Sequence, residues 1–127
     1  MSITPPAPDS PLRQRLRDAL RIAMKARDRL EIGVLRSTLA AIDNAETVEV
    51  GAAADRGKAI EESPVGAGAA DVVRRTLTEA EVERIVRAEV AAREAAAREY
   101  DTAGVPQRAE LLRAEARALL AHLAEPA

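Results

Sequence analysis

Apolar residues recur at every third or fourth position in four stretches of this 127-residue chain, a spacing typical of amphipathic helices. The first stretch begins at Ser10, a favourable N-cap residue, and Pro11 follows at a position that suits the first turn of a helix. The pattern predicts one helix of about 15 residues with a single apolar face. The residues assigned to that face are Leu12, Leu16, Leu20 and Met24, with Ala19 and Ala23 between them.

The second stretch starts directly after Asp28, a predicted N-cap, and Glu31 completes an Asp-x-x-Glu box. The connection around residues 26–28 is so short that the two helices form either a tight hairpin or one bent helix. Gly33 costs about 1 kcal/mol relative to Ala inside a helix, so we expect another helix to approach closely there. The residues predicted to face inward are Leu30, Val34, Leu35, Thr38, Leu39, Ala41 and Ile42.

The second half of the chain contains clear start and stop signals for two more helices. Thr78 and Glu81 have the spacing of a capping box, which predicts a helix from Glu79 to about Thr102. Gly104 suits the residue that ends this helix, and the following Pro106 suits the start of the fourth helix. The apolar positions in these two helices are Val82, Ile85, Val86, Val90, Ala96, Tyr100, Leu112, Ala116, Leu119, Leu120 and Leu123.

The segments outside these helices are rich in turn residues. Residues 1–9 form a Pro-rich tail that is expected to be disordered, and residues 47–76 read as a variable, mobile connection. Within that connection a short helical turn is expected near Gly57–Glu62 and another turn near Ala69–Arg75. The sequence therefore predicts one all-α domain over residues 10–124, in which antiparallel hairpins 11–45 and 78–124 pack as a small bundle.

Composition narrows the class of protein. The chain has no Phe, no Trp and one Tyr, so its core must be built from Leu, Val, Ile and Ala. Such a thin core suits closely approaching helices and favours extra burial through self-association or a partner. Cys is absent, which excludes disulfides and thiolate chemistry. No apolar run approaches membrane-span length and the start lacks signal-peptide features, so a soluble cytoplasmic protein is expected.

Positive charge is concentrated in the first helical pair. Residues 12–45 hold eight basic and four acidic residues, a net charge of +4, whereas the whole chain carries −2. Five cations there are candidate contacts to an RNA backbone, which rewards clustered positive charge. The alternative is a solvated face whose charges pair with the acidic second half. The candidates are Arg13, Arg17, Arg21 and Lys25, spaced by four residues, and Arg36.

No constellation for catalysis, metal binding or cofactor binding is predicted. His122 is the only histidine and has no evident nucleophile partner, so a surface or structural role is expected. No Glu-x-x-His motif or Gly-rich phosphate loop occurs. Most carboxylates of the second half alternate with Arg at helical spacing, which predicts exposed ion pairs. These pairs are Glu83–Arg87, Glu89–Arg93, Glu94–Arg98 and Glu110–Arg113.

Several motifs follow one another in the order typical of a known family. The first helical pair contains Met24-Lys-Ala-Arg-Asp28, followed by Val34-Leu-Arg36 and Leu39-Ala-Ala-Ile42. After the loop, the pattern continues with Leu77-Thr78-Glu-Ala-Glu81. The helix that follows ends in Tyr100-Asp-Thr-Ala-Gly104. In these respects residues 12–123 resemble YqeY-like proteins of the GatB/YqeY group. The chain departs from that family at its close, which reads His122-Leu123-Ala124-Glu125-Pro126 instead of aromatic-Leu-Pro, and it resembles the family's N-terminal helical domain alone.

The resemblance implies a non-catalytic helical module associated with tRNA or with a tRNA-dependent amidotransferase. That enzyme class is labelled carbon–nitrogen ligase with glutamine as amido donor, and its chemistry lies in other domains. The alternative is a protein-interaction or self-associating helical bundle without an RNA role. A third possibility, amide transfer by the chain alone, has no residues here to support it.

Overall fold

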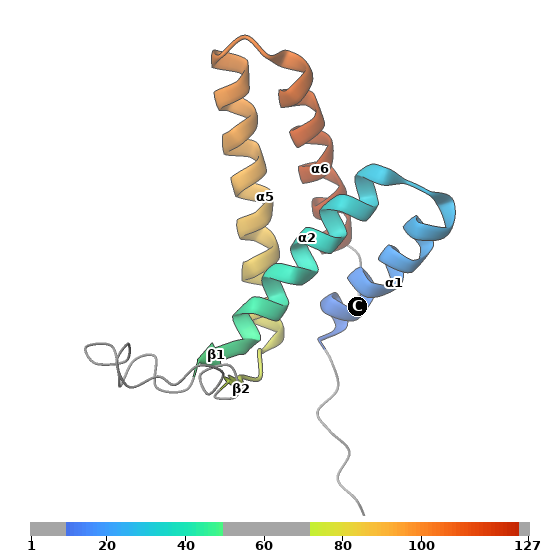
Figure 1. The fold of residues 1–127 in the computed structure, drawn as a ribbon, viewed down its shortest axis with the longest axis vertical. Helices are drawn as coiled ribbons and strands as arrows, with labels where there is room; N and C mark the ends of the chain where they lie inside the picture. The colour runs from blue at the N-terminus through green and yellow to red at the C-terminus, as the bar shows by residue number, and fades with distance from the viewer. Residues whose placement is uncertain (1–9, 50–71, 125–127) are drawn as a thin grey trace, which may run out of the picture.

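A computed structural model describes residues 10–49 and 72–124 of the chain. Helix α1 (Pro11–Ala26) and helix α2 (Arg29–Glu46) form one antiparallel hairpin, and α5 (Glu79–Thr102) and α6 (Pro106–Ala124) form the other. The predicted all-α class with two hairpins is confirmed (Figure 1). The predictions for residues 1–9 and for a turn near residues 57–62 lie outside the described residues.

Helix starts agree with the capping residues chosen from the sequence. The Ser10 hydroxyl accepts a hydrogen bond from the Arg13 amide at 3.0 Å, and the Asp28 carboxylate accepts one from the Glu31 amide at 3.2 Å. At the start of α5 the capping box is reciprocal, because Thr78 and the third helical residue each accept the other's amide. These local signals mark three helix starts, and the start of α1 is also held by Glu79 of α5, which accepts hydrogen bonds from the Ser10 hydroxyl and the Leu12 amide.

The first helix of each hairpin is followed by a residue in the left-handed backbone conformation. Arg27 follows α1 with φ 58°, and Gly104 follows α5 with φ 80°. In each turn the amide of the following residue donates a hydrogen bond to the carbonyl five residues earlier. Asp28 donates to Ala23 at 3.0 Å, and Val105 donates to Tyr100 at 2.8 Å. This is the Schellman pattern, in which glycine is the usual residue because the left-handed conformation costs it nothing. The tight-hairpin alternative for residues 26–28 is therefore the one observed.

The core lies where α2 crosses the α5–α6 hairpin (Figure 1). Met24 does not belong to it, contrary to the prediction, because its exposed fraction is 47%. A four-residue step advances about 40° beyond a full helical turn, so a series of such steps rotates out of the core. The buried cluster consists of Leu12, Leu16, Ala23, Val34, Leu35, Leu39, Ile42, Val82, Val86, Val90, Ala116 and Leu119.

Two further expectations are corrected. Gly33 is exposed and nothing lies within 4 Å of the position that a Cβ would take, so no helix approaches it. The ends of the predicted 47–76 loop are paired, since β1 (Thr47–Glu49) and β2 (Val72–Arg74) form a short antiparallel ladder with Val48 opposite Val73. The turn expected over residues 69–75 is therefore replaced by a strand at Val72–Arg74.

The α5–α6 hairpin extends beyond the first hairpin at its upper end (Figure 1). Its two helices approach through small residues there, because Ala97 and Ala109 are both fully buried without belonging to the main core. The half-buried ring of Tyr100 lies beneath the Arg108 guanidinium, 5.7 Å from its centroid. This extension depends on contacts within one hairpin alone.

Candidate functional site

The described residues lack the constellations needed for catalysis with a metal. Across residues 10–49 and 72–124, no three or more His, Asp or Glu side chains gather as metal ligands. None of the helices in those ranges has the length and apolar character that crossing a membrane requires. The candidate sites are therefore surfaces, and two of them meet at α1.

The stripe predicted along α1 is not a single surface. Arg13 has an exposed fraction of 4%, Arg17 is half-buried, and Arg21 and Lys25 are exposed. The cause is the rotation that also exposes Met24, since three four-residue steps turn about 120° around the helix. Arg13 is thus removed from the candidate RNA surface, and Arg21, Lys25 and Arg36 remain on the exposed part.

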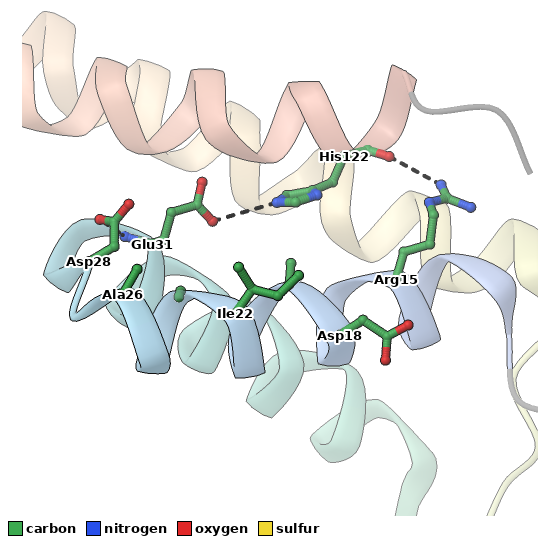
Figure 2. A pocket seen from close by; sticks show the side chains of 9 residues that line it. Arg15, Asp18, Ile22, Ala26, Asp28, Glu31 and His122 are labelled. Carbon is green, nitrogen blue, oxygen red and sulfur yellow. Dashed lines mark hydrogen bonds and ion pairs between the residues drawn. The ribbon is translucent and has the colours of Figure 1, made fainter.

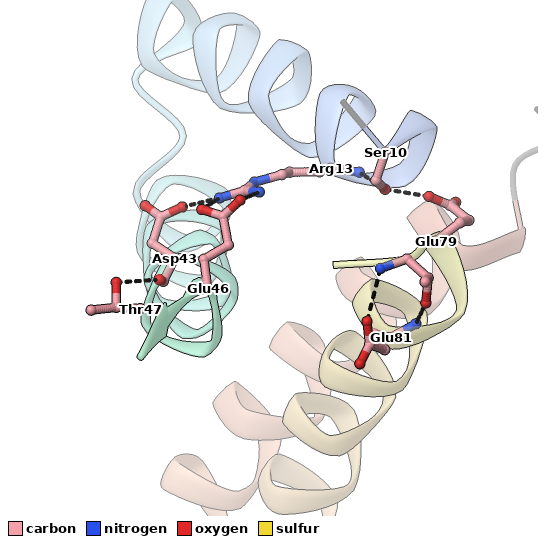
Figure 3. A network of polar contacts seen from close by, with 8 residues as sticks. Ser10, Arg13, Asp43, Glu46, Thr47, Glu79 and Glu81 are labelled. Carbon is pink, nitrogen blue, oxygen red and sulfur yellow. Dashed lines mark hydrogen bonds and ion pairs between the residues drawn. The ribbon is translucent and has the colours of Figure 1, made fainter. Parts of the chain in front are cut away.

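Arg13 ties α1 to the end of α2 (Figure 3). Its two terminal nitrogens donate to the two Glu46 carboxylate oxygens at 2.7 and 2.9 Å, and one of them also donates to Asp43. The hydrogen bond to Glu46 is the main reason that the pKa of Arg13 is raised, with Asp43 adding to it and burial opposing it. The guanidinium is held inside the first hairpin and serves its structure.

The exposed cations of the first hairpin are named the basic tip: Arg21, Lys25, Arg27, Arg29 and Arg36. Lys25, Arg27 and Arg29 flank the α1–α2 turn, whereas Arg21 and Arg36 lie farther along α1 and α2. Nearby carboxylates are already engaged, because Asp18 pairs with Arg21, and Asp28 accepts the Glu31 amide. Apart from Arg21, no member of the tip forms an ion pair with a described carboxylate. The tip therefore presents positive charge to solvent.

Arg27 is the unusual member of the basic tip. Its φ of 58° and ψ of 38° place it in the left-handed region, where a side chain costs roughly 1–2 kcal/mol and glycine is favoured. Sequence reasoning assigned it no role, because a lone Arg in a turn has no motif. It lies in the two-residue connection between the helices, and its side chain is exposed.

The second surface is a groove of about 430 Å³ between α1 and the end of α6, which we name the α1 groove (Figure 2). Its floor is made of small apolar residues, and Ile22, with an exposed fraction of 68%, stands at its middle. Charged side chains mark its two ends. The lining residues are Arg15, Asp18, Ala19, Ile22, Ala23, Ala26, Asp28, Glu31 and His122.

His122 closes one wall of the α1 groove through two contacts. Its Nε2 lies 3.5 Å from the Glu31 carboxylate, and its backbone carbonyl accepts a hydrogen bond from Arg15 at 3.1 Å (Figure 2). The Arg15 guanidinium is favourable there because the last carbonyls of α6 carry partial negative charge. These contacts are structural ones, and they dock the end of α6 onto both helices of the first hairpin.

The sequence contained one signal for the α1 groove that the prediction did not use. Ile22 is a large aliphatic residue on α1 that belongs to neither the predicted apolar face nor the charged stripe. The groove itself arises from the docking of α6 beside α1, which residue spacing within one helix does not specify.

Comparison with known proteins yields no relative. No protein-family model matches the chain, and neither the curated proteins nor the solved structures contain a match.

Proposed function

We propose that this chain is a non-catalytic helical module that binds RNA through the basic tip. The observation that carries the proposal is the exposure of Lys25, Arg27 and Arg29 around one turn, with no described carboxylate paired to any of them. Clustered cations bind phosphates by releasing counterions, and this term supplies most of the affinity in sequence-independent RNA binding. A tRNA, held beside a tRNA-dependent amidotransferase-like assembly, is the RNA that the GatB/YqeY resemblance favours.

Recognition at the basic tip would depend on the phosphate backbone and on RNA shape. Stacking of unpaired bases requires aromatic platforms, and the single aromatic residue, Tyr100, lies in the last turn of α5 and not in the first hairpin. Arg27 supports a ligand role because a cation occupies a backbone position that favours glycine. In this proposal the chain positions RNA and leaves amide transfer to other domains.

The test compares two triple variants of equal charge change. Lys25→Gln/Arg27→Gly/Arg29→Gln removes three cations from the basic tip, and Arg84→Gln/Arg98→Gln/Arg117→Gln removes three exposed cations from α5 and α6. Binding of tRNA and of a charge-matched unrelated RNA is measured at several salt concentrations. We expect the tip variant to lose affinity and about one unit of salt slope per phosphate contact, and the α5–α6 variant to retain both.

Two results would contradict the proposal. Equal loss in both triple variants would mean that overall charge, and not the basic tip, attracts RNA. Absence of saturable binding by the unaltered chain would assign the module to protein contacts. Equal affinity for both RNAs would keep the tip as an RNA site but remove the preference for tRNA.

A further inference from the structure

Gly33 stands inside α2 without a structural reason for glycine. Its backbone is helical, and of the described glycines it is Gly104, not Gly33, that has a positive φ. Nothing lies within 4 Å of the position that a Cβ would take, so no packed helix requires the side chain to be missing. Glycine destabilises a helix interior relative to alanine through its larger loss of backbone entropy. The fold gains nothing from this glycine, and the use that remains is close approach of an outside molecule.

Two arginines flank Gly33 on the outer face of α2. Arg29 lies four residues before it and Arg36 three residues after it, so each is about one helical turn away. Residues seven apart lie within about 20° of one another around a helix and about 10 Å apart along its axis. Both arginines are exposed, and neither forms an ion pair with a described carboxylate. Gly33 is therefore a gap between two available cations.

The outer face of α2 carries no acidic residue near Gly33. The helix has its carboxylates elsewhere, because Glu31 lies 3.5 Å from His122 and Asp43 pairs with Arg13 (Figure 3). The exposed residues of α2 within about 60° of Gly33 are Arg29, Arg36, Ser37, Ala40 and Asn44. This face is therefore positively charged, and its side chains are smallest between the two arginines.

We propose that one strand of the RNA backbone crosses the outer face of α2 at Gly33, with Arg29 and Arg36 holding phosphates on either side of the crossing. This inference rests on the proposed function and extends the RNA contact from the α1–α2 turn along α2. The missing side chain lets the sugar–phosphate backbone touch the helix, where both guanidinium groups reach it. RNA is favoured over a protein partner because two cations without an acid complement a chain of phosphates, which guanidinium groups bind with paired hydrogen bonds.

The first test fills the gap at Gly33 and measures RNA binding by the full chain. Gly33→Leu should lower tRNA affinity about tenfold and reduce the salt slope by about one unit, because a phosphate contact is lost. Gly33→Ala should show a smaller loss while raising the midpoint of urea unfolding, so its weaker binding cannot come from damage to the fold. Ala91→Leu is the matched control, because Ala91 is exposed on α5, outside the first hairpin, and gains the same side chain.

A double-variant cycle tests whether Gly33 acts through its arginine neighbours. Arg36→Gln alone should weaken binding, and its loss should be less than additive with that of Gly33→Leu, since the added side chain already keeps RNA away from Arg36. Lys25→Gln removes a cation from the other helix of the hairpin, so its loss should add to that of Gly33→Leu.

The failure of this inference is distinguishable from the failure of the proposed function. If Lys25→Gln/Arg27→Gly/Arg29→Gln loses RNA affinity but Gly33→Leu binds like the unaltered chain, the crossing at Gly33 is wrong and the basic tip remains an RNA site. Equal weakening by Ala91→Leu, or full additivity of Gly33→Leu with Arg36→Gln, would also overturn the crossing. An unaltered chain that binds neither tRNA nor an unrelated RNA would overturn both proposals.

Discussion

Arg13 on α1 and Glu46 on α2 form a two-pronged ion pair, in which each terminal guanidinium nitrogen donates to a different carboxylate oxygen. The Arg13 side chain is 5% exposed and the Glu46 side chain is 20% exposed, so water has little access to this ion pair. The pair joins the first turn of α1 to the last turn of α2, directly before β1. It therefore fixes the open end of the first hairpin, opposite the basic tip.

Glu46→Ala should destabilise the fold by about 3 kcal/mol, because it removes the two-pronged carboxylate partner of a buried guanidinium, and the neighbouring Asp43 is largely exposed. Urea unfolding measures the change. The double variant Arg13→Met/Glu46→Leu should recover much of the loss, since apolar side chains of similar size remove the buried charge altogether. Equal stability of Glu46→Ala and the unaltered chain would mean that the pair contributes nothing net.

Arg93 joins three helices in the second half of the chain. It donates to Glu89 on its own helix at 2.8 Å, to Glu115 on α6 at 2.9 Å and to the Ser37 hydroxyl on α2 at 3.0 Å. The sequence predicted an exposed Glu89–Arg93 pair, but the Arg93 side chain is 13% exposed because α6 covers it. This residue holds α2 against the α5–α6 hairpin.

Arg93→Ala should therefore cost about 2 kcal/mol of unfolding free energy, since hydrogen bonds to charged groups are worth more than neutral ones. Arg87→Ala is the control, because Arg87 forms an exposed pair with Glu83 on the same helix and its loss should cost no more than about 0.5 kcal/mol. Both values come from urea unfolding. Similar costs for the two variants would show that Arg93 acts as an ordinary surface cation.

Local signals predicted this fold well, and tertiary contacts account for the errors. Ser10, Asp28, Thr78 and Gly104 end or begin helices as expected, because each satisfies backbone groups within a few residues. Arg13 was misplaced because its burial depends on carboxylates about 30 residues away. The pair Glu94–Arg98, predicted from spacing alone, is not formed among the described residues, whereas Glu83–Arg87 and Glu110–Arg113 are.

The candidate sites were also predictable from local signals only in part. The excess of positive charge in the first hairpin follows from the sequence, and of the five cations predicted to contact RNA, Arg21, Lys25 and Arg36 are exposed, Arg17 is half-buried and Arg13 is buried. The exposure of Arg27 and Arg29 beside them was not predicted and depends on the geometry of the turn. The α1 groove was not predicted, since it exists only where α6 ends beside α1.

Gly33→Ala should stabilise the protein by about 0.5–1 kcal/mol. Gly33 lies inside α2, its added Cβ would meet nothing within 4 Å, and Ala loses less backbone entropy on folding. Gly104→Ala should have the opposite effect, because its φ of 80° is unfavourable for any residue with a Cβ. Thermal or urea unfolding of both variants checks the prediction, and a stabilised Gly104→Ala would contradict the assigned turn.

Glu81 makes the stability of the α5 start dependent on pH. Its carboxylate accepts the Thr78 amide at 2.9 Å and the Arg75 guanidinium at 3.1 Å. These contacts, the Thr78 amide first and Arg75 second, hold the pKa of Glu81 below its ordinary value of 4.5. The folded state therefore binds this proton less readily than the unfolded chain does. The resulting stabilisation is present above pH 4.5 and is lost as pH falls through the lower, folded pKa.

Glu81→Gln should accordingly be less stable than the unaltered chain at neutral pH, and the difference should shrink steadily as the pH is lowered to about 3. Urea unfolding at several pH values measures the difference directly. Glu94→Gln is the control, because Glu94 lies exposed on the same helix and forms no ion pair with a described residue, so its effect should be small throughout. A gap between Glu81→Gln and the unaltered chain that stays constant into acid would show that the Glu81 charge does not stabilise the capping box.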